Sequence, residues 1–258
     1  MSKPEGIGKL YLVGLGPGGL EHLTPAAQEA LRQADSVVGY RPYVEQVGPL
    51  VQGKNLVAME LGQELERASK AVELAYAGHQ VAVVSSGDTG IYGMAGPVFR
   101  ILVDLGWDGE SPALEILPGV SAMQAAAALL GSPLMQDFCA ISLSDLLTPW
   151  EAIRRRLEAA AQGDFVVALY NPRSQKRNQQ LQEARSILLG HRSGQTPVGI
   201  VRDAYRPGQG VTLTDLEHLI EHVESVYMVT VVWIGNSTSF VHQGRMVTPR
   251  GYEVKPTP

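Results

Sequence analysis

Short apolar runs alternate along the chain with longer segments in which apolar residues recur every three or four positions. The runs at residues 9–16, 36–40, 55–60, 81–86 and 114–117 predict strands, and the segments at 24–34, 64–78, 97–106 and 122–131 predict helices. The first helix has Thr24 as its expected cap and Pro25 at its first position. Strands that alternate with helices indicate an α/β fold with a mostly parallel sheet.

The pattern changes after about Pro133. Helices at 150–163 and 174–190 and strands at 139–143, 165–170 and 198–204 continue the alternation, whereas residues 210–216 and 227–235 are typical of a β-rich meander around one short helix. This change predicts two unlike α/β domains. We expect the N-terminal domain, with the glycine-rich loops, at residues 1–134 and the C-terminal domain at residues 135–258.

Composition narrows the class of protein. The 258 residues are 45% hydrophobic and 18% charged, which suits a soluble chain with a large buried core. We expect no transmembrane segment and no signal peptide, because every apolar run is far shorter than the roughly 20 residues of a membrane helix. A single cysteine, Cys139, fits a reducing cytoplasm. The net charge of -5 gives no reason to expect a nucleic-acid partner, and the scattered histidines show no metal-site pattern.

The segment YLVGLGPGGL, residues 11–20, has glycines at the spacing of a dinucleotide-binding fingerprint. In that fold the glycine turn runs straight into a helix, and an acidic residue ends the second strand. Here the helix signals come later, at Thr24 and Pro25, and the second strand ends in Tyr40. Pro17 also removes one backbone amide that a phosphate would use. A nicotinamide-dependent oxidoreductase is therefore the weaker alternative.

Glycine-rich segments follow three of the predicted strands, at residues 14–19, 87–96 and 118–122. Asp88 lies within the second of them. Because the carboxyl ends of parallel strands meet at one edge of a sheet, the three segments together predict a ligand cleft. Each segment alone is equally well explained as a tight turn between a strand and a helix.

Several segments occur in the order typical of one enzyme family: VGLGPGG, LTPAAQEALRQADSVVGY, SSGDTGIYGMA, PGVSAMQAAAA, VRDAYRPGQ and VWIGNS. Together they resemble the tetrapyrrole methylases, which transfer methyl groups from S-adenosylmethionine to corrin and sirohaem precursors. The segments SSGDTGIYGMAG, YNPRSQKRNQQLQEA and IVRDAYRPGQ resemble the branch of cobalamin biosynthesis that methylates precorrin-3B at carbon 17 with ring contraction to precorrin-4. The chain departs from the family at Gly19, where an aspartate is common.

The resemblance implies a tetrapyrrole methylase fold of two α/β domains with the active-site cleft between them, and a homodimer. It also implies S-adenosyl-L-methionine as cofactor and S-adenosyl-L-homocysteine as product. The positions that match the family's cofactor contacts are Pro17, Gly87, Asp88, Ile91, Ser121, Ala122, Tyr170, Ala204 and Thr230. Most of these contacts need shape and backbone groups more than side-chain chemistry, which fits the many Gly and Ala residues.

The implied reaction consists of a methyl transfer and a ring contraction. Methyl transfer is an in-line displacement that requires positioning in a dry site and no covalent enzyme intermediate. The ring contraction requires removal of a proton from a hydroxyl on the macrocycle. Asp145, with Ser144 beside it, is our candidate for this role, and the substrate's own acetate groups are an alternative. Capping of the next helix explains the Ser-Asp pair equally well.

A substrate with many carboxylates predicts arginines in its binding site. The candidates on loops at predicted strand ends are Arg41, Tyr43, Arg173 and Arg206. Solvated surface charge is the alternative for each arginine, and it is the preferred explanation for Arg177. The sequence leaves two further choices open. The substrate is either metal-free precorrin-3B or the cobalt-factor III of the anaerobic route, and a non-catalytic tetrapyrrole-binding protein is a third hypothesis.

Overall fold

The computed structural model describes residues 8–174 and 177–251. The chain forms two compact units, residues 1–122 and 123–258. The prediction of two unlike α/β parts is confirmed. The division lies earlier in the chain than the expected boundary between residues 134 and 135, because the helix that begins at Ala122 belongs to the second unit for almost all of its length.

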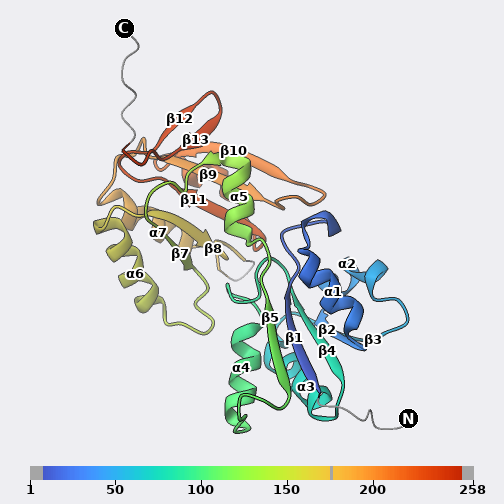
Figure 1. The fold of residues 1–258 in the computed structure, drawn as a ribbon. Coiled ribbons are helices and arrows are strands. Elements are labelled where there is room, and N and C mark those ends of the chain that lie inside the picture. Colours follow the sequence, from blue (N-terminus) through green and yellow to red (C-terminus); the bar gives the residue numbers. More distant parts are fainter. Residues whose placement is uncertain (1–7, 175–176, 252–258) are drawn as a thin grey trace. The chain divides into compact units, whose positions relative to one another are not determined.

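The first unit contains a parallel sheet with the strand order β3-β2-β4-β1-β5 (Figure 1). Its strands are β1 (Lys9–Gly14), β2 (Ser36–Tyr40), β3 (Asn55–Met59), β4 (Gln80–Ser85) and β5 (Ala113–Leu117). Its helices are α1 (Pro25–Gln33), α2 (Arg41–Gln46), α3 (Glu64–Tyr76) and α4 (Ala95–Asp104), with short 3-10 turns η1 (Leu20–His22) and η2 (Gly48–Leu50). This is the parallel architecture predicted from the alternation of strands and helices.

Helices cover both faces of this sheet. Successive residues of a strand point to opposite faces. Tyr11 and Val13 of β1 therefore pack in the cluster that contains α1, whereas Leu10 and Leu12 pack in the cluster that contains α3 and α4. The predicted start of α1 is confirmed, because the Thr24 hydroxyl accepts a 3.1 Å hydrogen bond from the Ala27 amide.

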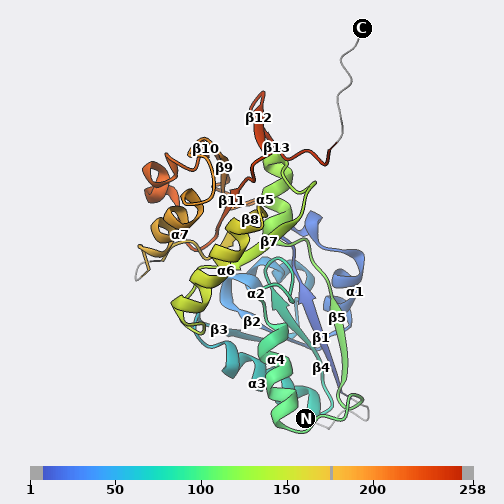
Figure 2. The same ribbon diagram turned by 90° about the vertical axis from the view of Figure 1, so that its left-hand side faces the viewer.

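The second unit contains a mixed sheet with the strand order β10-β9-β11-β8-β7. Its strands are β7 (Phe138–Ser142), β8 (Val166–Tyr170), β9 (Pro197–Arg202), β10 (Gly210–Asp215) and β11 (Thr230–Ile234). Strands β7 and β8 are parallel, and the other neighbours pair antiparallel. The predicted β-rich character is confirmed, but the predicted meander is wrong, because β11 does not continue beside β10 and instead pairs with β9 and β8. A small sheet joins β6 (Gly131–Ser132) to the hairpin β12 (Phe240–His242) and β13 (Arg245–Val247), seen in Figure 2.

Helices again lie on both sides of the sheet. One face packs against α6 (Trp150–Gln162), α7 (Gln180–Leu189) and the 3-10 turn η3 (Leu219–Ser225). On β9, a Cβ at Gly199 would lie 2.4 Å from the Leu130 side chain, so α5 (Ala122–Leu130) packs closely against the sheet. The helix predicted over 174–190 is shorter than expected, since α7 begins only at Gln180. Residues 175–176 of that prediction lie outside the described residues.

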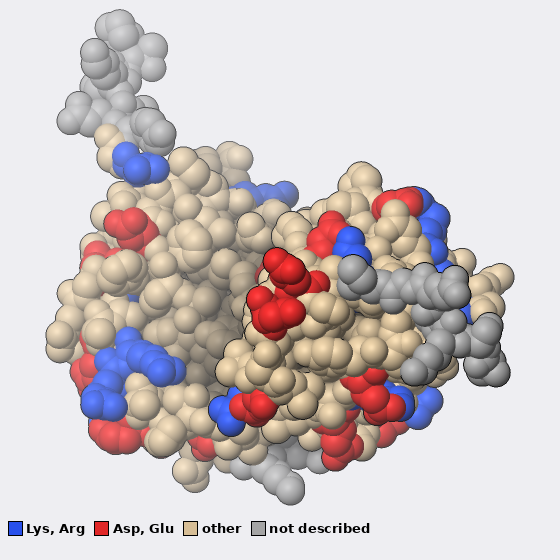
Figure 3. All heavy atoms as spheres, turned by 60° about the horizontal axis from the view of Figure 1, so that its bottom comes forward, with Lys and Arg blue, Asp and Glu red and all other residues tan. Residues whose placement is uncertain are grey.

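Charge is mixed over the face that Figure 3 shows. Lys and Arg side chains form small groups there, separated by Asp, Glu and neutral residues. The expectation that nucleic acid is not a partner stays a prediction. Within residues 8–174 and 177–251, every helix falls short of the length and apolar character that a membrane span requires.

Candidate functional site

The three glycine-rich loops of the first unit follow β4, β1 and β5, which are neighbours in the sheet. Their meeting at one edge is therefore a consequence of strand order. The first two loops are joined directly, because Gly16 and Gly87 exchange backbone hydrogen bonds of 3.0 and 2.8 Å. Pro17 follows Gly16 at this bridge and is buried.

Asp88 joins the second loop to the third. Its carboxylate accepts a 2.8 Å bond from the Gly90 amide and a 3.0 Å bond from the Gly119 amide. The packing here leaves no room for side chains, since a Cβ at Gly119 would lie 2.2 Å from the Gly87 carbonyl oxygen. Gly87 itself has a φ of +66°, a conformation that favours glycine. These contacts assign Asp88 to loop architecture, a role that the sequence analysis did not predict.

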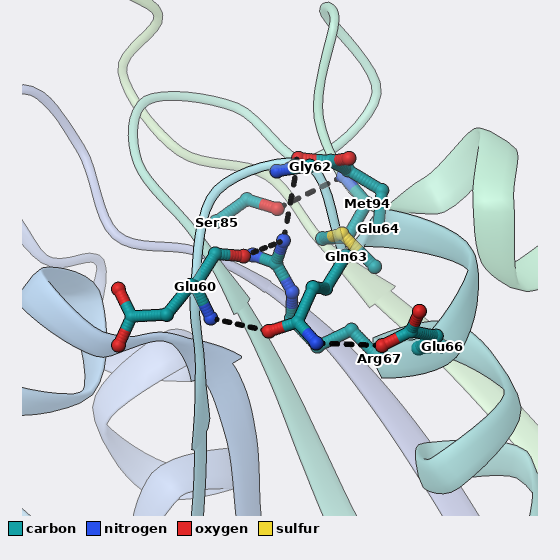
Figure 4. Close-up of polar contacts among 8 residues, drawn as sticks. All are labelled: Glu60, Gly62, Gln63, Glu64, Glu66, Arg67, Ser85 and Met94. Carbon is teal, nitrogen blue, oxygen red and sulfur yellow. Dashed lines mark hydrogen bonds and ion pairs between the residues drawn. The ribbon is translucent and has the colours of Figure 1, made fainter.

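The remaining predicted cofactor positions of this unit lie in the same loops. Ile91 is half-buried in the second loop, Ser121 is buried, and Ala122 is half-buried at the start of α5. The base of the second loop is fixed by the Ser85 hydroxyl, which accepts a 2.9 Å bond from the Met94 amide (Figure 4). Next to Asp88, the Thr89 hydroxyl is buried and has no hydrogen-bond partner among the described residues.

The fingerprint-like first loop does not have the context of a dinucleotide site. The 3-10 turn η1 separates its glycines from α1, which begins only at Pro25. The α1 amides therefore do not follow the glycine turn as pyrophosphate binding requires. Asp35, which precedes β2, accepts a 3.0 Å bond from the Gln80 amide instead of ending the strand. This geometry agrees with the choice against a nicotinamide cofactor.

In the second unit, the predicted cofactor positions Tyr170, Ala204 and Thr230 lie at one edge of the sheet. They stand at the end of β8, just after β9 and at the start of β11, and β11 pairs antiparallel with both other strands. The Tyr170 hydroxyl accepts a 2.9 Å bond from the Met123 amide, one of the amides at a helix N-terminus that lack an intrahelical partner. The Trp233 indole donates to the Met123 carbonyl at 3.3 Å, so both polar groups of that residue are held by the sheet.

Two residues that sequence reasoning missed connect Ala204 to Thr230. The Tyr227 hydroxyl donates to the Asp203 carboxylate, and this hydrogen bond raises the pKa of Tyr227. Asp203 and Tyr205, on either side of Ala204, have φ values of +46° and +58°, which are uncommon outside glycine. Backbone in such conformations is held by its surroundings and often occurs at ligand sites. The sequence offers little signal for this strain.

The candidate catalytic pair lies in a polar cluster at the ends of β7 and β8. Oδ2 of Asp145 accepts a 2.9 Å bond from the Gln180 side chain, and the Ser144 hydroxyl lies 3.4 Å from an Arg177 nitrogen. The alternative of helix capping is not observed, because the N-cap of α6 is Pro149. Arg177 is 6% exposed, so its interpretation as solvated surface charge is wrong.

The predicted substrate-binding residues have different surroundings. Arg41 is exposed and pairs with Glu60 at 2.7 Å, and Tyr43 packs edge-on against Tyr40. Arg173 donates to the Val223 carbonyl at 2.8 Å and pairs with Glu224 at 3.2 Å. The Arg206 amide donates to the Asp203 carbonyl at 2.9 Å, which places this residue beside Ala204. The substrate roles of all four stay predictions.

The cavity described here does not contain the predicted site residues. One cavity of about 230 Å³ lies between β9, β10 and η3, and its lining includes Arg202, Thr212 and His222 but none of the predicted site residues. Within the described ranges, no three His, Cys, Asp or Glu side chains lie together as metal ligands would.

The sequence is similar to proteins of one enzyme family. The family model of the tetrapyrrole (corrin/porphyrin) methylases matches residues 9–220. The cobalt-factor III methyltransferase of Priestia megaterium is 49% identical over 97% of this chain, which spans about half (46%) of the length of that relative. The precorrin-3B C(17)-methyltransferase of a Sinorhizobium species is 44% identical over 81% of this chain and 82% of its own length.

A solved structure agrees with this assignment. The crystal structure of the methyltransferase CobJ has a TM-score of 0.88 and 39% sequence identity, and the match covers 94% of this chain and 100% of the solved one. The conserved architecture thus extends over both units. The chain belongs to the tetrapyrrole methylase family.

Proposed function

We propose that the chain is an S-adenosylmethionine-dependent methyltransferase of cobalamin biosynthesis that methylates precorrin-3B at carbon 17, with ring contraction to precorrin-4. Cobalt-factor III, the cobalt-containing counterpart, is the alternative substrate. Family membership and the names of the two relatives support a methyltransferase of this branch. The observation that carries the proposal is the convergence of the three glycine-rich loops, which Asp88 and the Gly16–Gly87 bridge hold together.

The residues of these loops fit the cofactor. Gly90 is exposed, and a Cβ there would meet only an Asp88 oxygen, at 3.2 Å, so the backbone at this position is open to close approach by a ligand. The unpartnered Thr89 hydroxyl offers a buried polar group in the same loop. We infer that S-adenosylmethionine is held by Pro17, Gly87, Asp88, Ile91, Ser121 and Ala122 of the first unit and by Tyr170, Ala204 and Thr230 of the second.

When bound, the cofactor supplies an activated methyl group on a sulfonium. The protein's task is then to position the nucleophilic carbon and exclude water. Rigid backbone suits this task, and the two-bond bridge and the Asp88 carboxylate fix the backbone of the loops. Thr230 supplies mainly its backbone, because its own hydroxyl already accepts a 3.1 Å bond from the Tyr227 amide.

Asp145 is the proposed proton acceptor for the ring contraction. Gln180 engages Oδ2, and no described residue donates a hydrogen bond to Oδ1, so this oxygen is available to a substrate hydroxyl. Arg41, Tyr43 and Arg206 are proposed to bind substrate carboxylates. Arg41 and Arg173 each already pair with a carboxylate, that of Glu60 and that of Glu224, and Arg173 is the weaker candidate because its guanidinium also donates to the Val223 carbonyl. A homodimer in the cytoplasm is part of the same proposal.

The decisive experiment is incubation of the protein with S-adenosylmethionine carrying a labelled methyl group, separately with precorrin-3B and with cobalt-factor III. Mass analysis is expected to show one added labelled methyl on precorrin-3B and the absorbance change of a contracted ring. Transfer only to cobalt-factor III would select the alternative substrate. Transfer to neither, with active cofactor and intact tetrapyrrole, would refute the proposal.

Calorimetric titration separates this proposal from the two other hypotheses. S-adenosylhomocysteine is expected to bind and NADH is not, since α1 starts too late to hold a pyrophosphate. Binding of NADH in preference would favour the oxidoreductase. A protein that binds tetrapyrrole but neither binds S-adenosylhomocysteine nor transfers methyl groups would be a non-catalytic binding protein.

A further inference from the structure

Arg177 is a buried cation with little compensation inside the protein. One guanidinium nitrogen donates a 2.9 Å bond to the Asn171 carbonyl, the contact with the Ser144 hydroxyl is long at 3.4 Å, and Nε is buried without a partner among the described residues. Burial lowers the pKa of Arg177, while the nearby Asp145 charge acts in the opposite direction. Burying a cation is costly unless it is paired with an anion.

Two other buried arginines show how the chain compensates such charges elsewhere. Arg67, shown in Figure 4, is 3% exposed and has the Glu64 carboxylate at 3.3 Å. Arg192 is 8% exposed and donates to three backbone carbonyls, those of Ala160, Phe165 and Gly235. Arg177 has neither an ion pair nor such a set of carbonyls within the described part of the chain. The Nε atoms of Arg67 and Arg192 also lack a partner among the described residues, so what distinguishes Arg177 is the missing carboxylate or set of carbonyls around its terminal guanidinium nitrogens.

The surroundings of Arg177 are built to hold it in place. Its backbone exchanges hydrogen bonds of 2.9 and 3.2 Å with Ser174. Asn171, whose carbonyl it contacts, has a φ of +49° and donates a 3.0 Å bond to the Ser142 hydroxyl, which also accepts a 3.2 Å bond from the Ser144 amide. A cation fixed in this way loses little conformational freedom when it binds an anion.

The neighbouring surface indicates what kind of anion would bind. Leu146 and Leu147 follow Asp145 directly and are 82% and 98% exposed. An apolar surface next to a fixed cation suits a large apolar ligand that carries carboxylates, and guanidinium groups bind carboxylates through two parallel hydrogen bonds. A tetrapyrrole with acidic side chains has this chemistry. The cluster also lies one residue beyond Tyr170, a proposed cofactor position.

We propose that Arg177 binds a carboxylate of the tetrapyrrole beside Asp145. The assignment rests on the proposed function and adds a substrate-binding residue that the sequence analysis had set aside. The unpartnered Nε and an adjacent guanidinium nitrogen supply the two donors. Asp145 and Gln180 keep their own hydrogen bond in this arrangement.

The test compares the variants Arg177→Gln and Arg177→Lys with the wild type, using Arg154→Gln as a control. Arg154 belongs to the same unit but lies on α6, where it pairs with Glu151. Arg177→Gln is expected to raise the KM for the tetrapyrrole by about 10- to 100-fold, as loss of a charge-assisted pair predicts. The Kd for S-adenosylhomocysteine and kcat are expected to change by less than about threefold. Arg177→Lys keeps the charge but cannot form two parallel hydrogen bonds to a carboxylate. Its KM is therefore expected to lie between those of the wild type and Arg177→Gln.

A purely structural role gives a different result. If Arg177 only supports the loop after β8, S-adenosylhomocysteine affinity and thermal stability would fall together, and lysine would not restore KM selectively. That outcome, or a KM within twofold of wild type, would overturn the proposal. Should Arg177→Gln fail to fold, the KM of a stable Arg177→Lys variant decides in the same way. An inactive wild type would refute the proposed function itself, and this inference with it.

Discussion

Asp88 offers the sharpest test of how the candidate cofactor site is built. Its two carboxylate oxygens accept bonds from the Gly90 and Gly119 amides, at 2.8 and 3.0 Å. A hydrogen bond to a charged group contributes about 1.5–3 kcal/mol, and the lower value is appropriate for these partly exposed positions. Asp88→Ala therefore removes about 3 kcal/mol of loop organisation.

Most of this lost free energy is expected to appear as weaker ligand binding and not as a less stable fold. The loops lie at the edge of the sheet, so the free protein can release them without opening its core. Three kcal/mol corresponds to a rise of about 100-fold in the Kd for S-adenosylhomocysteine, measured by isothermal titration calorimetry. Far-UV circular dichroism is expected to stay unchanged. Asp88→Asn keeps one acceptor oxygen and loses one bond, so its Kd is expected to rise only about tenfold.

The two variants separate a loop-holding role from a direct ionic contact with the ligand. If the Asp88 charge itself bound the ligand, Asp88→Asn would lose as much affinity as Asp88→Ala. Asp108→Ala is the matched control, because Asp108 also accepts two backbone amides, at 2.8 and 2.9 Å, but lies in the loop before β5 at the opposite edge of the sheet. Its Kd is expected to stay within twofold of wild type. Unchanged affinity in Asp88→Ala, or an equal loss in Asp108→Ala, would refute the reasoning.

Three further predictions concern single contacts. Gly119→Ala places a Cβ 2.2 Å from the Gly87 carbonyl oxygen and is expected to weaken S-adenosylhomocysteine binding at least tenfold, whereas Gly96→Ala, which meets nothing within 4 Å in α4, is expected to leave it unchanged. Tyr170→Phe removes the acceptor of the Met123 amide and is expected to lower Tm by about 2–4 °C in calorimetry; an unchanged Tm would contradict this. The Asp215 hydrogen bond and charge raise the pKa of His218, so this exposed pair stabilises the fold below about pH 6.5 and loses its effect as pH rises through the raised value. His218→Gln is expected to flatten that part of the Tm-pH profile, and an identical profile would show that the pair contributes nothing.

The parts of the fold that sequence predicted well depend on local signals. Thr24 and Pro25 mark the start of α1 through one cap and one fixed dihedral angle, and both act within a single turn. The three glycine-rich loops were also predictable, because each follows a strand and parallel strands end at the same edge. The hairpin β12–β13 was not predicted, since strands of three residues show too little alternation to be recognised.

The roles of individual side chains were harder to predict, because they depend on distant partners. The cofactor role of Asp88 stays a prediction, and the loop contact that the structure adds is with Gly119, 31 positions away in the sequence. Arginines are mostly exposed, which favours surface charge for Arg177, whereas its burial depends on the segments just after β7 and β8 that carry Ser144 and Asn171. The Asn171-Pro172 pair was the one local signal for this turn, since Asn tolerates a positive φ and Asn-Pro favours turns.

Each unit organises its share of the candidate residues with contacts inside that unit. The first unit uses the Gly16–Gly87 bridge and the Asp88 carboxylate, and the second uses the Tyr170 hydroxyl and the pair of Asp203 and Tyr227. Loops that are ordered before binding spare the ligand the entropic cost of ordering them. Cofactor binding should therefore require little rearrangement of these loops, and a substitution that removes one of the contacts should weaken binding mainly by restoring that ordering cost.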